Sequence, residues 1–362
     1  MARLEEPSSR RTGSSGLQGL IKRVVEYRFL RNLSGDKREE VQEDLGLFRR
    51  LLADQRTPRI AVVGQSETDL TDLLEKATGH ELTGEPDIKA YLGHERWYDY
   101  EFGETTLELL DLRTSGGEEP CLKAVERQGP DVVLALWEWH DQTPDPTLEA
   151  LERIEARARD SGGTTPPAIA VVHDSKLPED KTLRDAERIV RQRLADSTIP
   201  NTSTSVVRFN QPWELVDEIV EAVPMEARLK MTRLVGSSET KKRMARDIIR
   251  SSAGLTAAIA TLPLPVADIV PITSIQLSMV ASVAYLSGKP FELRTVGEFL
   301  GAAGLNVGAG FALREAARIL VKFIPFAGPA ISSGIATAAT FGIGNAAVAY
   351  FIEDKPGDAL EI

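Results

Sequence analysis

Short apolar runs alternate with longer amphipathic stretches throughout residues 59–222. Apolar runs of about five residues bounded by turn residues are typical of strands that are buried on both faces, and the amphipathic stretches are typical of covering helices. The pattern predicts an α/β fold with a doubly wound, mostly parallel sheet. The predicted strands are residues 59–63, 97–102, 106–111, 131–137, 168–173 and 205–209, and the predicted helices are residues 68–78, 120–128, 146–161, 181–196 and 212–223.

The second and third predicted strands are separated by two or three residues that include Gly103 and Glu104. So short a connection can join antiparallel strands but not parallel ones, which need a long crossover. We therefore expect one antiparallel edge strand beside five parallel strands.

Charge is distributed unevenly along the chain and marks a second domain. Residues 248–352 contain ten charged residues, about one in ten, whereas 27% of the whole chain is charged. Such a low density marks a separate domain with a different burial regime. Proline turns at 262–263 and 324–325, each followed by a longer apolar helix, predict two helical hairpins and thus an all-α, apolar helical domain. Residues 323–352 carry no charge and are long enough to span a bilayer, but prolines and polar residues interrupt them. Membrane insertion and a compact soluble bundle both stay open.

These patterns divide the chain into six segments. Residues rich in Ser, Arg, Gly and Pro open the chain, and this composition is typical of disorder. Helical spacing of apolar residues follows, before the first strand. The predicted segments are a disordered tail at 1–15, N-terminal helices at 16–56, the α/β domain at 57–224, a basic linker helix at 225–250, the apolar helical-hairpin domain at 251–353, and a tail at 354–362.

Composition excludes several classes of protein. The 43 Lys and Arg residues against 54 Asp and Glu residues give a formal net charge of −11, which disfavours a nucleic-acid partner. The single cysteine, Cys121, excludes a disulfide framework and a Cys-rich zinc site, and the four histidines lack metal-ligand spacing. We expect no metal, and because the first residues do not form an apolar signal segment, we expect a cytoplasmic protein.

Residues 59–79 read as an apolar strand, a loop from Gly64, and a helix that ends in Ala-Thr-Gly. This segment resembles the first strand, phosphate loop and first helix of Era-like bacterial GTPases, whose loop reads Gly-x-x-x-x-Gly-Lys-Ser/Thr. Gly64 matches the first glycine of that loop, and Thr71 matches the hydroxyl that binds magnesium. The resemblance implies a P-loop G domain in which Gly64, Thr71 and Asp111 are remnants of a nucleotide site.

Three positions depart from the family pattern. Asp69 and Leu70 stand where the family has the second glycine and the lysine, and Lys176 stands where it has the aspartate that reads guanine. The loop binds phosphates through backbone N–H groups and the lysine, and each lost charged hydrogen bond weakens binding by roughly 1.5–3 kcal/mol. The resemblance thus implies a degenerate GTPase with no catalytic residues and no cofactor. Weak GTP–magnesium binding and an unrelated α/β domain are the alternatives.

The C-terminal region carries its own resemblance. The stretches Leu-Pro-Leu-Pro-Val-Ala-Asp at 262–268, Gln-Leu-Ser-Met at 276–279 and Phe-Ile-Pro-Phe-Ala-Gly-Pro at 323–329 lie in its apolar sequence. They resemble the uncharacterised apolar helical domain that follows GTPase modules in bacterial GTPase-like, membrane-associated proteins. That resemblance implies a bacterial, membrane-associated protein.

A basic segment precedes this region. Between residues 226 and 250 there are eight cations and three acids. A basic collar beside an apolar domain favours contact with an anionic bilayer surface, while a solvated helix face is the alternative. The residues predicted to contact the membrane surface are Lys241, Lys242, Arg243 and Arg246.

Together these observations predict a pseudo-GTPase that acts as a binding or scaffolding protein. Residues 251–353 are expected to dock on a membrane surface or on a protein partner, and homo-oligomers are compatible with this reading. The predicted location is the cytoplasm, either free or at the cytoplasmic face of the inner membrane. The alternative is an enzyme, an atypical weak GTPase whose phosphate site is completed in trans.

Overall fold

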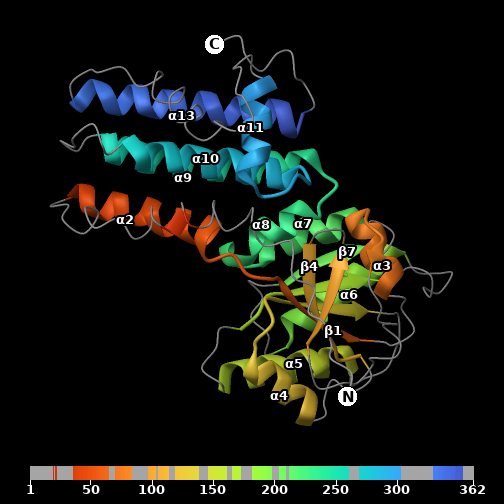
Figure 1. Ribbon diagram of the computed structural model, residues 1–362. Coiled ribbons are helices and arrows are strands. Elements are labelled where there is room, and N and C mark those ends of the chain that lie inside the picture. The colour runs from red at the N-terminus through yellow and green to blue at the C-terminus, as the bar shows by residue number, and fades with distance from the viewer. Residues whose placement is uncertain are drawn as a thin grey trace, which may run out of the picture. The chain divides into compact units, whose positions relative to one another are not determined.

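The chain forms two compact units in a computed structural model (Figure 1). Residues 56–237 make up the sheet unit, and residues 1–55 with 238–362 make up the helical unit. The predicted tails at 1–15 and 354–362 lie outside the described residues. The structure describes residues 19, 21–22, 36–64, 70–83, 97–102, 105–113, 119–137, 146–160, 165–172, 182–197, 204–208, 212–260, 269–302 and 329–353.

The sheet unit contains a seven-stranded sheet with the order β2-β3-β4-β1-β5-β6-β7. The five strands from β4 to β7 in this order run parallel to one another. The expected mixed α/β fold with a mostly parallel sheet is confirmed. The strands are β1 (Arg59–Gly64), β2 (Leu82–Thr83), β3 (Tyr98–Phe102), β4 (Thr105–Asp111), β5 (Val132–Trp137), β6 (Ala168–Val172) and β7 (Thr204–Arg208).

The prediction of a single antiparallel edge strand was wrong in one respect. Strand β3 is antiparallel to β4, as expected, with Tyr100 opposite Leu107. However, β2 pairs antiparallel to β3 outside it and forms the edge, with Leu82 opposite Phe102. A strand of two residues is too short to show a period of alternation, so the hydrophobic pattern could not reveal it.

Helices cover both faces of the sheet, as β1 illustrates. Ile60 and Val62 belong to a core shared with α3, α7 and α8, whereas Ala61 and Val63 belong to a core shared with α4, α5 and α6. Alternate residues of a strand point to opposite faces, so a strand buried on both sides must be apolar throughout. The helices are α3 (Leu70–Thr78), α4 (Glu119–Arg127), α5 (Pro146–Asp160), α6 (Leu183–Ala195), α7 (Pro212–Ala222) and α8 (Met225–Arg233).

The boundary between the units, after Ser237, falls inside the predicted basic linker at 225–250. The predicted linker helix at 225–250 is two helices, α8 and α9 (Ser238–Ala260), and they belong to different units. Ala227 and Met231 of α8 are buried in the core of the sheet unit. The N-terminal residues likewise belong to the helical unit and do not form a segment of their own.

In the helical unit, α9 packs against α2, α10 and α13. A Cβ at Gly344 of α13 would lie 2.6 Å from Cγ1 of Ile249, and Lys242 Nζ lies 2.7 Å from Glu353 Oε1. These two contacts place α9 and α13 antiparallel. The elements of this unit are α2 (Asp36–Phe48), the π-helical turn η2 (Arg49–Ala53), α9, α10 (Ile269–Leu286), α11 (Leu293–Ala302) and α13 (Pro329–Phe351).

Polar side chains are buried inside this unit. Gln276 Nε2 on α10 donates to Thr340 Oγ1 on α13 over 3.0 Å. The hydroxyls of Ser278 and Ser282 each donate over 2.7 Å to the backbone carbonyl four residues before them. Such back-bonding lets a helix bury small polar residues, because their hydrogen bonds stay within the helix. The predicted proline turns at 262–263 and 324–325 lie outside the described residues.

We predict that Gly64→Ala strongly destabilises the sheet unit. Gly64 has a φ of 113°, and a Cβ there would lie 2.1 Å from the backbone oxygen of Leu136 on β5. Backbone strain and overlap together should lower the free energy of unfolding by about 3 kcal/mol or more. Urea denaturation measures this, with Gly236→Ala as control because it has open space around its Cβ position. Equal stability of the two variants would show that the left-handed backbone and the close approach of Leu136 do not require glycine at position 64.

Candidate functional site

The three predicted nucleotide-site remnants come from β1, α3 and β4. Val62 of β1 is the register partner of Asp111 at the end of β4, so Gly64 and Asp111 both lie at the carboxyl edge of the sheet. Ligands of open α/β sheets bind at this edge. The structure places Thr71 half-buried as the second residue of α3. Asp69 and Lys176 lie outside the described residues.

Gly64 has a structural reason to be glycine that does not involve phosphate. It is the last residue of β1 and pairs with Leu136 of β5. The left-handed backbone and the approach of the Leu136 carbonyl leave no room for a side chain. Glycine at this position is therefore explained by strand packing alone.

Leu70 stands where the resembled family has its phosphate-binding lysine, and it is buried. Its side chain is 2% exposed and belongs to the same core as Ile60 and Leu73. An ammonium group in that position would lose its hydration without gaining a partner, which is strongly unfavourable. The first turn of α3 thus contributes an apolar core residue where the family has a cation.

Asp111 is held by an arginine two residues after it. Arg113 donates from its backbone N over 3.1 Å and from Nε over 2.9 Å to Oδ1, and from Nη2 over 2.7 Å to Oδ2. The two side chains are 3% and 7% exposed, respectively, for Arg113 and Asp111. Bidentate pairs of this kind are among the strongest charged contacts, and buried ones are lost only at a high energetic cost.

This pairing determines what Asp111 can do chemically. In the resembled family the aspartate supports magnesium, which requires a carboxylate free to accept from the metal's water ligands. Here both carboxylate oxygens already accept hydrogen bonds, from the Arg113 guanidinium and from the Arg113 backbone N. A magnesium ion at this place would have to displace a buried cation or lie beside it. Among the described residues, no group of three or more His, Cys, Asp or Glu could hold a metal ion.

Arg113 is the residue that sequence reasoning missed. Its position was visible in the motif, because it follows the strand-end aspartate by two residues. Residues at that spacing project to the same side of an extended chain. The sequence therefore indicated that Arg113 could reach the carboxylate of Asp111, the predicted magnesium ligand.

The four predicted membrane-surface cations lie in the first turns of α9. Lys242 pairs with Glu353, and Arg246 Nη2 lies 2.6 Å from Glu239 Oε1. Arg243 Nη2 donates to Thr240 Oγ1 over 3.4 Å, and Lys241 is half-buried. The acids on α9 and after α13 compensate part of the positive charge of this segment.

Neither a protein-family model nor a curated protein matches the chain. Among solved structures, the bacterial dynamin GTPase LeoA from ETEC is similar over 92% of this chain and 77% of its own, at 12% identity and a TM-score of 0.35. A mutation variant of SsGBP is similar over 59% of this chain and 69% of its own, at 14% identity and a TM-score of 0.28.

We predict that Arg113→Met lowers the stability of the sheet unit by about 3–5 kcal/mol, because the Asp111 carboxylate would be left buried without its partner. The double variant Asp111→Leu with Arg113→Met should recover most of this loss, since it removes both charges. Urea denaturation of the single and double variants gives the coupling between them. Additive effects of the two substitutions would show that the pair is not an interacting unit.

Proposed function

We propose that this protein is a pseudo-GTPase: a binding or scaffolding protein whose sheet unit does not hydrolyse GTP and whose helical unit docks on a membrane. The observation that carries the first part is the buried clamp of Arg113 on Asp111. The burial of Leu70 supports it, because the position of the phosphate-binding lysine is used for packing. Leu70 packs in the core where a lysine would bind phosphate, and Asp111 is paired with Arg113 where a free carboxylate would support magnesium.

Helix α13 supports the second part of the proposal. Among the described helices, it alone contains an 18-residue window apolar enough to cross a bilayer, Gly334–Phe351, with a mean hydropathy of 1.2. Only 28% of this window is buried, whereas the core helix of a soluble protein is mostly buried. Its exposed residues include Ala338 and Phe341, which favour an apolar surface over water.

The nucleotide test is a calorimetric titration of the full chain with GTP and magnesium. We expect no saturable binding below about 1 mM, because no described group offers a free cation to the phosphates at the position of Leu70. Asp111→Asn serves as control and should give the same trace.

A micromolar dissociation constant that Asp111→Asn removes would contradict the proposal. That result would instead support the alternative of an atypical GTPase, in which Asp111 leaves Arg113 and takes up its magnesium role. GTP hydrolysis that appears only with a partner protein would point to a site completed in trans.

The membrane test is cosedimentation with liposomes. Phe341→Asp should reduce the bound fraction severalfold, because it places a charge on the exposed face of α13. Trp213→Asp is the matched control: Trp213 is the other large hydrophobic residue exposed in the described part of the chain, and it belongs to the sheet unit. It should leave binding unchanged.

A further variant tests the basic segment of α9. Changing Lys241, Lys242, Arg243 and Arg246 to Gln should weaken binding to anionic liposomes, and salt should weaken it in the same direction. The effect should be smaller than four free cations would give, because Lys242 and Arg246 are already paired with acids. Recovery of the whole protein in the soluble fraction with every lipid would contradict membrane docking and favour a protein partner.

A further inference from the structure

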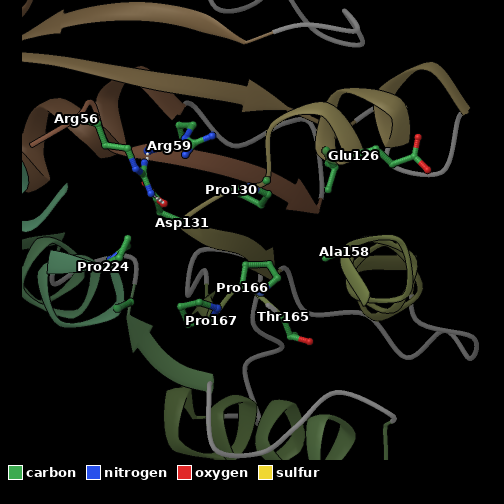
Figure 2. A pocket seen from close by; sticks show the side chains of 13 residues that line it. Arg56, Arg59, Glu126, Pro130, Asp131, Ala158, Thr165, Pro166, Pro167 and Pro224 are labelled. Atoms are coloured by element: carbon green, nitrogen blue, oxygen red, sulfur yellow. Dashed lines mark hydrogen bonds and ion pairs between the residues drawn. The ribbon is translucent and has the colours of Figure 1, made fainter. Parts of the chain in front are cut away.

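A pocket of about 620 Å³ opens at the amino edge of the sheet, opposite the edge that holds Asp111 (Figure 2). Its lining comes from the starts of β1, β5 and β6 and from the ends of α4 and α7. A volume of this size is within the range of small-molecule sites. Four prolines give it rigid walls: Pro130, Pro166, Pro167 and Pro224.

Charge in this pocket is organised around Asp131. Arg56 donates to both carboxylate oxygens, from Nη1 over 2.8 Å to Oδ2 and from Nη2 to Oδ1. The backbone N of Arg59 also donates to Oδ2, over 2.9 Å. The Asp131 side chain is 4% exposed. Its accepting capacity is thus largely used, and the Arg56 charge is compensated.

The other acid of the lining, Glu126, does not face the arginines. Its Oε1 lies 3.3 Å from Arg157 Nη1. Figure 2 shows the Glu126 carboxylate turned away from Arg56, Arg59 and Asp131. It is therefore not available to balance the remaining cation of the lining.

That remaining cation is Arg59. In the described part of the chain, its guanidinium makes neither a hydrogen bond nor an ion pair, although the group is half-buried. Burial lowers the pKa of Arg59, the charge of Arg56 lowers it further, and the carboxylates of Asp131 and Glu108 only partly offset this. Glu108 itself accepts a hydrogen bond from Gln128 Nε2 over 2.7 Å. The pocket thus contains a half-buried guanidinium whose charge is only partly offset by Asp131 and Glu108 and whose N–H groups donate no hydrogen bond in the described part of the chain.

We propose that this pocket binds a small organic oxyanion, either a phosphate monoester or a carboxylate, whose charged head pairs with Arg59 and whose body packs against the proline walls. The guanidinium offers five N–H donors in a fork that matches the geometry of both head groups. Prolines lack an N–H donor and present a rigid apolar surface, which suits a ring or a short hydrocarbon. The site is separate from the carboxyl edge and does not depend on the proposed function.

The experiment uses phenyl phosphate as the probe on the full chain, with inorganic phosphate as the head alone and phenol as the body alone. Calorimetry should give saturable binding of phenyl phosphate, tighter than either part. Arg59→Gln should weaken it at least tenfold, because a charged hydrogen-bonded pair is lost. Arg188→Gln is the matched control, since Arg188 is 74% exposed on α6 and pairs with Asp185.

Thermal unfolding provides a second, independent readout. Without the probe, Arg59→Gln should be as stable as the natural chain or more stable, because it removes a desolvated cation beside Arg56. Phenyl phosphate should raise the melting temperature of the natural chain and of Arg188→Gln, but not that of Arg59→Gln. Benzoate serves as the carboxylate counterpart of phenyl phosphate. Equal binding of phenyl phosphate by Arg59→Gln and the natural chain would overturn the proposal, and so would no binding of either compound to the natural chain up to about 10 mM.

Discussion

A sheet that is covered on both faces leaves little water at the ends of its central strands, so charged groups there need a partner within the protein. The two edges of the sheet unit meet this requirement in the same way. At the carboxyl edge Arg113 holds Asp111, and at the amino edge Arg56 holds Asp131. Each acid adjoins a parallel strand of the central sheet, and each is almost fully buried. The cost of separating such a pair makes both edges resistant to rearrangement.

Leu70 and Arg59 show two further consequences of this need for a partner. Leu70 places an apolar side chain where the resembled family has a cation, so no charge has to be paired in the first turn of α3. Arg59 keeps a half-buried charge that Asp131 and Glu108 offset only in part, and its guanidinium donates no hydrogen bond in the described part of the chain. At the carboxyl edge Asp111 is therefore paired within the described part of the chain, while at the amino edge the charge of Arg59 is only partly offset and lies beside a pocket. The proposed oxyanion pocket and the positions that resemble a nucleotide site therefore lie at opposite edges of one sheet.

The sequence predicted what depends on local periodicity. The six longer strands and the five helices α3 to α7 of the sheet unit follow from apolar runs and helical spacing, and the structure places them within a few residues of the predicted bounds. The two-residue strand β2 could not be predicted, because it has no period. The ion pair of Arg56 and Asp131 joins residues 75 positions apart, so it depends on tertiary packing that no local pattern contains. Leu70 was recognised as a substitution, but its burial became apparent only from the core that surrounds it.

The assignment of α8 and α2 to their units did not follow from the sequence for a related reason. Low charge density marked where the apolar helices begin, but it could not tell that α8 contributes to the core of the sheet unit or that α2 packs on α9. Composition likewise left membrane insertion and a soluble bundle open, since both need long uncharged helices. Side-chain exposure separates the helices: the described side chains of α10 are almost all buried, while α13 exposes one face.

In the proposed function, the Arg113–Asp111 pair and the buried Leu70 occupy positions that would hold magnesium and phosphate in the resembled family. A crystal structure of the full chain grown with magnesium and a non-hydrolysable GTP analogue tests it most directly. We expect Arg113 to remain bound to Asp111 and Leu70 to remain in the core, with no analogue at the carboxyl ends of β1 and β4. An analogue bound at that edge, with Arg113 displaced and magnesium held near Asp111, would contradict it.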